Sequence, residues 1–154
     1  MKSSMNPEHP ANQQVIRYLR RNGRQAALIA AADSIPDPYM EAGSHPEIVE
    51  RVWNGLGAKF PRDARCLFCG TPALIHPRTG VVLALGLGTR YGLRIPPDCT
   101  EAAIRAGAKT FTDWTTGGSM NTREDLGEDW IFGAWLADEV QWCRAAYALY
   151  GRED

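Results

Sequence analysis

The sequence predicts an α+β fold in which an antiparallel β-meander sheet is flanked by helices, with an N-terminal helical arm. Between residues 64 and 97, short apolar runs alternate with turn residues such as Pro77 and Gly80, as in successive strands of a meander. On both sides of this stretch, apolar residues recur at the spacing of amphipathic helices. A chain of 154 residues with 44% hydrophobic residues is long enough to build one domain around its own core.

The domain boundaries follow from where these patterns begin and end. The first residues are polar and rich in proline, which predicts a disordered tail, and the helical period begins after them. The predicted organisation is a disordered tail at 1–11, an N-terminal helical segment at 12–38 and a single α+β domain at 39–151.

Within the helical segment, Asn12 is the expected cap of a first helix. The apolar side chains on one face of this helix are Val15, Ile16 and Leu19. A second helix is predicted over 24–33, and a loop over 39–43.

The clearest helix signal in the chain covers residues 46–56. Ser44 is the expected N-cap and Pro46 falls in the first turn. Its apolar stripe consists of Ile48, Val49, Val52, Trp53 and Leu56. We expect this stripe to pack on the sheet.

The strands of the predicted sheet differ in how many faces they bury. The runs 81–85 and 130–135 are apolar on both faces, which is typical of strands covered on both sides. The run 91–95 alternates with Gly92 and Arg94, which predicts one face exposed to water.

The remaining elements lie toward the C-terminus. A short helix is expected over 101–106, an edge strand over 109–114 and a final helix over 138–150.

The overall composition argues against nucleic-acid-binding, membrane-spanning and disulfide-stabilised proteins. The formal net charge of −1 offers no global attraction for nucleic acid, and no segment reaches the roughly 20 apolar residues that a membrane span needs. Four cysteines in this length do not make a disulfide scaffold. We therefore expect a protein of the reduced cytoplasm that has no membrane contact.

The string C-x-x-C-G at Cys66, Cys69 and Gly70 resembles half of a zinc knuckle or a thiol redox motif, and His76 is the nearest histidine. In a strand, however, Cys66 and Cys69 would point to opposite faces, which favours buried structural cysteines and no bound cofactor. A zinc site, or a metal- or thiol-dependent enzyme that uses Cys66, Cys69 and His76, is the alternative. The sequence assigns no catalytic residue.

A group of basic residues in the first helical segment shares one helical face. Its members are Arg17, Arg20, Arg21 and Arg24. Such a face either grips phosphates, as in a nucleic-acid-binding accessory protein, or is the solvated side of an amphipathic helix. The near-zero net charge favours the second interpretation.

Large aromatic residues suggest a protein partner. Two strands require cover on both faces although the predicted helices are few, so another chain is expected to cover part of the sheet. The candidate partner-binding residues are Trp130, Trp135 and Tyr91. The prediction is a non-enzymatic protein-protein interaction protein, of the toxin-neutralising or accessory-subunit type, that binds another protein or itself.

Two strings of the sequence carry a resemblance. Residues 72–82 read P-A-L-I-H-P-R-T-G-V-V and residues 127–133 read G-E-D-W-I-F-G. Over roughly residues 40–150, the chain resembles a small uncharacterised bacterial protein family. The resemblance implies a bacterial origin, and it implies no activity and no site residue.

Overall fold

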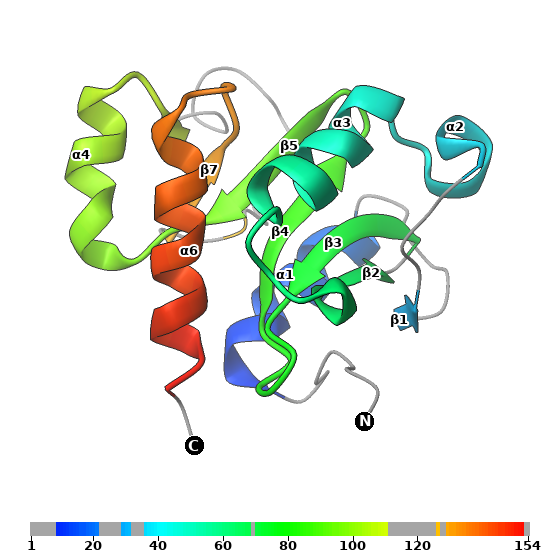
Figure 1. The fold of residues 1–154 in the computed structure, drawn as a ribbon, viewed down its shortest axis with the longest axis horizontal. Helices are drawn as coiled ribbons and strands as arrows, with labels where there is room; N and C mark the ends of the chain where they lie inside the picture. The colour runs from blue at the N-terminus through cyan, green and yellow to red at the C-terminus, as the bar shows by residue number, and fades with distance from the viewer. Residues whose placement is uncertain are drawn as a thin grey trace.

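The centre of the molecule is an antiparallel sheet in a meander. The computed structural model describes residues 9–21, 29–31, 36–68, 70–110, 126 and 129–152. In this part of the chain the sheet has seven strands in the order β1-β2-β3-β4-β5-β7-β6 (Figure 1). They are β1 (Ile29–Ala31), β2 (Arg65–Phe68), β3 (Thr71–Ile75), β4 (Val82–Leu87), β5 (Arg90–Arg94), β6 (Lys109–Thr110) and β7 (Trp130–Phe132). Every neighbouring pair is antiparallel, which confirms the predicted fold class.

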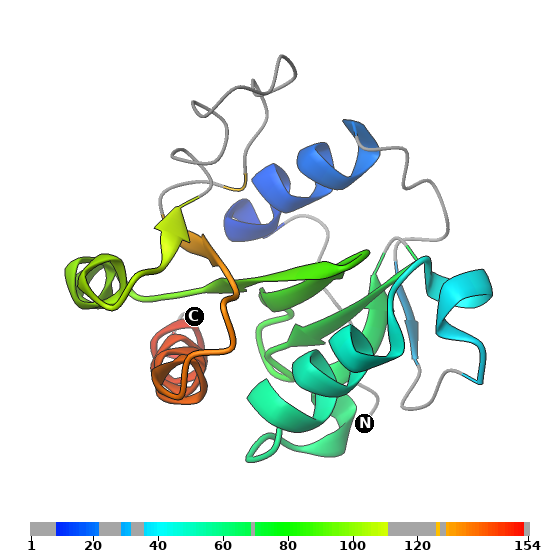
Figure 2. The same cartoon turned by 90° about the horizontal axis from the view of Figure 1, so that it is seen from above.

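Helices cover both faces of this sheet. They are α1 (Pro10–Arg21), α2 (Pro38–Ala42), α3 (Pro46–Glu50) with its π-helical continuation η1 (Arg51–Leu56), α4 (Thr100–Arg105) and α6 (Asp138–Tyr150), and two 3₁₀ turns, η2 (Arg62–Ala64) and η3 (Pro97–Cys99), complete the described elements. Figure 2 shows α1 on one face of the sheet, and α3 and α6 on the other. Two apolar clusters result, one beneath α1 and one beneath α3, η1 and α6.

This double cover corrects one premise of the sequence analysis. All residues of β3 are buried, as are those of β4 except its last. The chain's own helices supply the cover that the apolar strands require, because each helix contributes an apolar stripe. Uncovered strand surface is therefore no argument for a partner.

The N-terminal segment belongs to the same core. Helix α1 begins at Pro10, inside the tail predicted for 1–11, and residues 1–8 of that tail lie outside the described part. Asn12 does not cap α1. Its amide is buried, donates to the Gly80 carbonyl and accepts from the Val82 N–H, both at 2.9 Å. These bonds tie α1 to the β3–β4 hairpin, so helix α1 is packed on the domain and is not a separate arm.

Two local predictions in the first forty residues are wrong. A helix was predicted over 24–33, but Ile29–Ala31 forms strand β1 and pairs with β2. Alanine has the highest intrinsic helix propensity, but tertiary contacts can override propensity, and the edge of β2 offers backbone hydrogen bonds that a local pattern does not reveal. Where a loop was expected, Asp37 caps helix α2, which ends at Gly43 with φ 59°.

The predicted helix at 46–56 is confirmed and its whole apolar stripe is buried. The N-cap is His45 rather than Ser44, since the His45 ring accepts the Glu47 N–H at 3.0 Å. From Arg51 the helix widens into the π-helical segment η1, a form that occurs frequently at functional sites.

The C-terminal half contains two further differences. Arg94 was expected on a wet face of β5, yet only 3% of it is exposed. Strand β7 ends at Phe132 instead of residue 135. The Gly133 N–H makes one more bond in the same register, to the Tyr91 carbonyl, and the chain then turns toward α6. Helices α4 and α6 occur where they were predicted. Of the edge strand predicted over 109–114, Lys109–Thr110 forms β6, and residues 111–114 lie outside the described part of the chain.

Candidate functional site

The feature that stands out on the surface is Trp135, in the loop between β7 and α6. Its side chain is 54% exposed, and its φ of 61° is the one positive value among the described residues other than glycine. An L-residue in this left-handed region is strained by about 1–2 kcal/mol. Such strain persists only where surrounding contacts impose it.

Those contacts come from a buried network beneath the loop. The Tyr91 hydroxyl of β5 accepts the Trp135 N–H at 2.9 Å and donates to the Glu139 carboxylate of α6. The second oxygen of Glu139 accepts the Ala134 N–H at 2.7 Å. Glu139 is fully buried, so these bonds and its ion pair replace the water that the carboxylate has lost. Two consecutive backbone N–H groups of the loop are thereby held from below.

Gly133 lets the loop approach this network. A Cβ atom at position 133 would lie 1.9 Å from the Tyr91 ring, which no side chain tolerates. The Gly133 N–H also bonds to the Tyr91 carbonyl at 2.7 Å. The loop consequently wraps around Tyr91, and the Trp135 ring meets the Tyr91 ring edge-on with centroids 5.4 Å apart.

Arg51 closes the network from the η1 side. Its guanidinium donates to Glu139 at 2.9 Å and to the Tyr91 hydroxyl at 3.1 Å. It also lies 5.3 Å from the centroid of the Trp135 ring, within cation–π range. Burial lowers the pKa of Arg51, but the hydrogen bonds to Glu139 and Tyr91 outweigh burial and leave that pKa above its usual value. The arginine therefore remains a cation paired with Glu139.

Beside this network lies a shallow groove, which we call the Trp135 groove. It encloses about 330 Å³ and is lined by Glu47, Glu50, Arg51, Asn54, Gly55 and Trp135. Glu47 and Glu50 are exposed. Burial and the bond to Glu139 raise the pKa of Tyr91 to about 12, which makes its hydroxyl a poor acid or base near neutral pH. The arrangement is suited to binding rather than to proton transfer.

Of the residues predicted to contact a partner, one is exposed. Trp130 and Tyr91 are 0% and 1% exposed and belong to the core, so neither offers a docking surface. Trp135 alone faces solvent. Sequence reasoning missed Arg51 and Glu139, although Glu139 shares the buried stripe of α6 with Cys143 and Ala146 at the spacing i, i+4, i+7. An acidic residue on that stripe was a readable signal for a buried ion pair.

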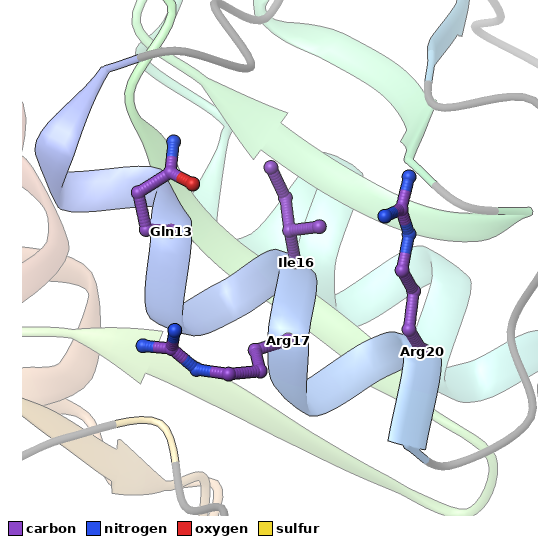
Figure 3. Close-up of a pocket in the computed structure, with 4 residues that line it drawn as sticks. All are labelled: Gln13, Ile16, Arg17 and Arg20. Carbon is purple, nitrogen blue, oxygen red and sulfur yellow. The ribbon is translucent and has the colours of Figure 1, made fainter.

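The predicted basic face is part of α1. Arg17 and Arg20 line a shallow groove of about 370 Å³ together with Gln13 and Ile16. The guanidinium groups of Arg17 and Arg20 point away from each other (Figure 3), and Arg17 donates to Gln14 at 3.1 Å. Arg21 is the last residue of α1, and Arg24 lies outside the described residues.

Of the predicted metal or thiol residues, Cys66 and His76 lie in different parts of the fold. Cys66 is buried in the cluster beneath α1, and burial raises the pKa of its thiol to about 12. His76 packs on Tyr147 of α6, with ring centroids 4.2 Å apart, and its Nδ1 accepts the Arg78 N–H at 3.1 Å. Cys69 lies outside the described residues, and among those described no group of three His, Cys, Asp or Glu side chains is placed to hold a metal ion.

A second arginine, which is buried, joins α1, the sheet and α6. Arg94 donates to Asp129 at 2.8 Å and to the carbonyls of Val82 and Ala11 at 2.9 Å each. Tyr150 donates to the same Asp129 oxygen at 3.1 Å. This second network connects elements to one another and presents no exposed aromatic ring.

Comparison of the chain with protein-family models, with curated proteins and with solved structures gives no significant match. The family resemblance of the two sequence strings remains a prediction. Among the described residues, no helix combines the length and apolar character that crossing a bilayer requires.

Proposed function

We propose that this chain is a non-enzymatic protein-interaction protein of the bacterial cytoplasm, of the toxin-neutralising or accessory-subunit type. Its partner contacts the surface around Trp135. One observation carries the proposal: a large aromatic side chain is kept exposed, in a strained backbone conformation, by a buried hydrogen-bonded network. Tryptophan is among the residues most enriched at the energetic centres of protein interfaces.

The strain itself argues for a role beyond folding. A glycine at position 135 would adopt φ 61° without penalty, and an exposed loop residue contributes little to the core. The chain instead places there the side chain with the largest contact area and holds the backbone N–H groups of Ala134 and of Trp135 itself in place. A pre-ordered aromatic anchor loses little conformational entropy on binding.

The cytoplasmic placement rests on the thiols. Cys66, Cys99 and Cys143 are free in the described part of the chain, and two of them are buried. Free thiols are typical of a reducing compartment. A metal- or thiol-dependent enzyme built on Cys66, Cys69 and His76 receives no support from the geometry, because Cys66 and His76 pack in different places.

The test is capture of a partner by the tagged protein in its native host, followed by mass spectrometry. We expect one stoichiometric protein with the wild type and its loss with Trp135→Ala. Ile104→Ala is the matched control, because Ile104 is a similarly exposed apolar residue on α4. A partner that the Trp135→Ala variant still captures, or the absence of any stoichiometric partner, would contradict the proposal.

A second candidate is nucleic-acid binding through α1, favoured by the groove that Arg17 and Arg20 line. Phosphate contacts predict binding that weakens steeply with salt. The measurement is fluorescence anisotropy with labelled duplex and single-stranded DNA between 50 and about 200 mM salt. Loss of binding in Arg17→Ala/Arg20→Ala, but not in Arg105→Ala on α4, would favour this candidate.

A further inference from the structure

We infer that the Trp135 groove receives a cationic side chain, preferably arginine, from the partner protein. The inference rests on the proposed function and specifies the chemistry of the partner. Three features of the groove carry it: its uncompensated charge, its aromatic wall and its shallow open form.

The charge of the groove is negative. Arg51 lines it but is already paired with the buried Glu139 at 2.9 Å, so these two charges cancel. Glu47 and Glu50 remain, both exposed, and neither forms an ion pair with a described residue. Glu50 accepts only a neutral donor, the Asn54 amide, at 3.0 Å. A partner that places a positive charge here gains two charge-assisted contacts, whereas an acidic partner is repelled.

The wall of the groove selects among cations. The Trp135 ring is half exposed, and its contact with Arg51 shows that a guanidinium packs against it at 5.3 Å. Arginine combines a planar group that stacks on tryptophan with paired donors for carboxylates, while lysine offers a more strongly hydrated point charge. Gly55 leaves room for the Arg51 side chain, since a Cβ there would lie only 3.1 Å from it.

The experiment uses the full chain and defined peptides, so it does not depend on knowing the partner. A capped pentapeptide with a central arginine is titrated to millimolar concentration and followed by ¹H–¹⁵N NMR. The chain has five tryptophans, so the Trp135 indole signal is assigned from the Trp135→Phe variant. The comparison peptides carry citrulline, which is neutral and of nearly the same shape, or lysine.

We expect the arginine peptide to shift the Trp135 indole signal and the backbone signals of Asn54 and Gly55. Binding of the lysine peptide should be weaker, and binding of the citrulline peptide weaker still. Glu47→Gln/Glu50→Gln should lower affinity for the arginine peptide about fivefold, as expected for two exposed charge pairs. The control Asp98→Asn/Glu101→Gln removes the same charge near α4 and should leave affinity unchanged.

Two results would overturn the inference. Equal shifts with arginine and citrulline would mean that the groove binds by apolar contact alone, and no shift with either would mean that it does not take such a side chain. Neither result would change how partner capture depends on Trp135, because capture is a separate measurement that tests the proposed function. Loss of capture in Trp135→Ala with equal peptide binding would thus retain the interaction role and reject its charge preference.

Discussion

Two arginines, Arg51 and Arg94, each form an ion pair and lie against aromatic rings, but the two networks serve different roles. Arg51 pairs with Glu139 and Arg94 with Asp129, at 2.9 and 2.8 Å, and each guanidinium also lies against aromatic rings. The Arg94 guanidinium donates its remaining hydrogen bonds to main-chain carbonyls and lies over the ring of Trp130, which is fully buried. The Arg51 network holds a loop whose tryptophan faces solvent.

The difference lies in where each network directs its hydrogen bonds. Around Arg94, the acceptors belong to α1 and β4, so the ion pair fastens two elements. Around Glu139, the donors are the backbone N–H of Ala134 and the hydroxyl of Tyr91, which in turn accepts from Trp135. A buried ion pair is by itself weak support for stability. The Arg51–Glu139 network is better explained by the exposed Trp135 side chain that it holds in place than by a gain in the stability of the fold.

The largest effect on stability is expected for Arg94→Met. The change leaves Asp129 without its cation and removes the Arg94 donors from the carbonyls of Val82 and Ala11. We expect the free energy of unfolding to fall by about 3 kcal/mol, the low end for a broken buried pair, because Asp129 keeps some access to water. Urea denaturation measures the change.

Arg105→Met is the matched control for this variant. Arg105 faces Glu101 at 3.5 Å with both side chains exposed, and such pairs contribute less than about 1 kcal/mol. Similar losses in the two variants would show that the Arg94 network does not fasten α1 to the sheet. Partner capture should survive in Arg94→Met under conditions where the protein is folded.

A smaller loss of stability but a larger loss of binding is expected for Tyr91→Phe. The phenyl ring keeps the packing and removes only the hydroxyl that connects Glu139 to the Trp135 N–H. Losing a hydrogen bond to a buried charge lowers the free energy of unfolding by about 1–3 kcal/mol. Partner capture should fall although Trp135 is still present, because its backbone is no longer held. Undiminished capture would mean that the network does not position Trp135.

A still smaller difference in stability is expected between two variants at position 135, and it separates the cost of backbone strain from the loss of side-chain contacts. Trp135→Gly and Trp135→Ala both remove the indole, but only glycine relieves the strain of φ 61°. The glycine variant should be more stable than the alanine variant by about 1 kcal/mol, the lower bound for a left-handed residue. Both should lose partner capture. An alanine variant as stable as the glycine variant would indicate that the loop relaxes without the ring and stores no strain.

The comparison of the two networks also shows how far sequence reasoning extends. The apolar stripe of α3 and η1 and the apolar run of β4 were readable because the pattern of apolar residues reports directly on burial. Arg94 was not, since alternation along β5 places it on a wet face when its partner is unknown. Glu139 stood out as an acidic residue on an apolar stripe, but the pattern does not name the residue that pairs with it. Their partners, Asp129 and Arg51, are 35 and 88 residues away.

The candidate site was partly within reach of the sequence. Trp135 was among the residues predicted to bind a partner, but it was assigned to the same strand as Trp130. Nothing in the local sequence distinguishes a core tryptophan from an exposed one. The positive φ at residue 135 depends on the Tyr91 hydroxyl, which reaches the loop only after β5 and β7 have paired. Strand β1 was missed for a related reason, because an edge pairing with β2 overrode a local helical preference.

The smallest effect expected is a pH dependence that arises from His76. Burial lowers the pKa of His76, and the nearby Arg78 charge lowers that pKa further. The unfolded chain therefore binds a proton more readily than the folded one, so the His76 contribution to stability is complete above about pH 6.5 and is lost as the pH falls through the lower folded pKa. Protonation would also remove the Nδ1 lone pair that accepts the Arg78 N–H.

His76→Asn keeps an acceptor for that N–H without titrating, so the stability of the wild type relative to this variant should decrease between pH 8 and pH 5 in urea denaturation. A relative stability that stays constant over this range would mean that His76 takes up a proton in the fold as readily as in the unfolded chain, and that the turn at 76–79 does not depend on the neutral ring.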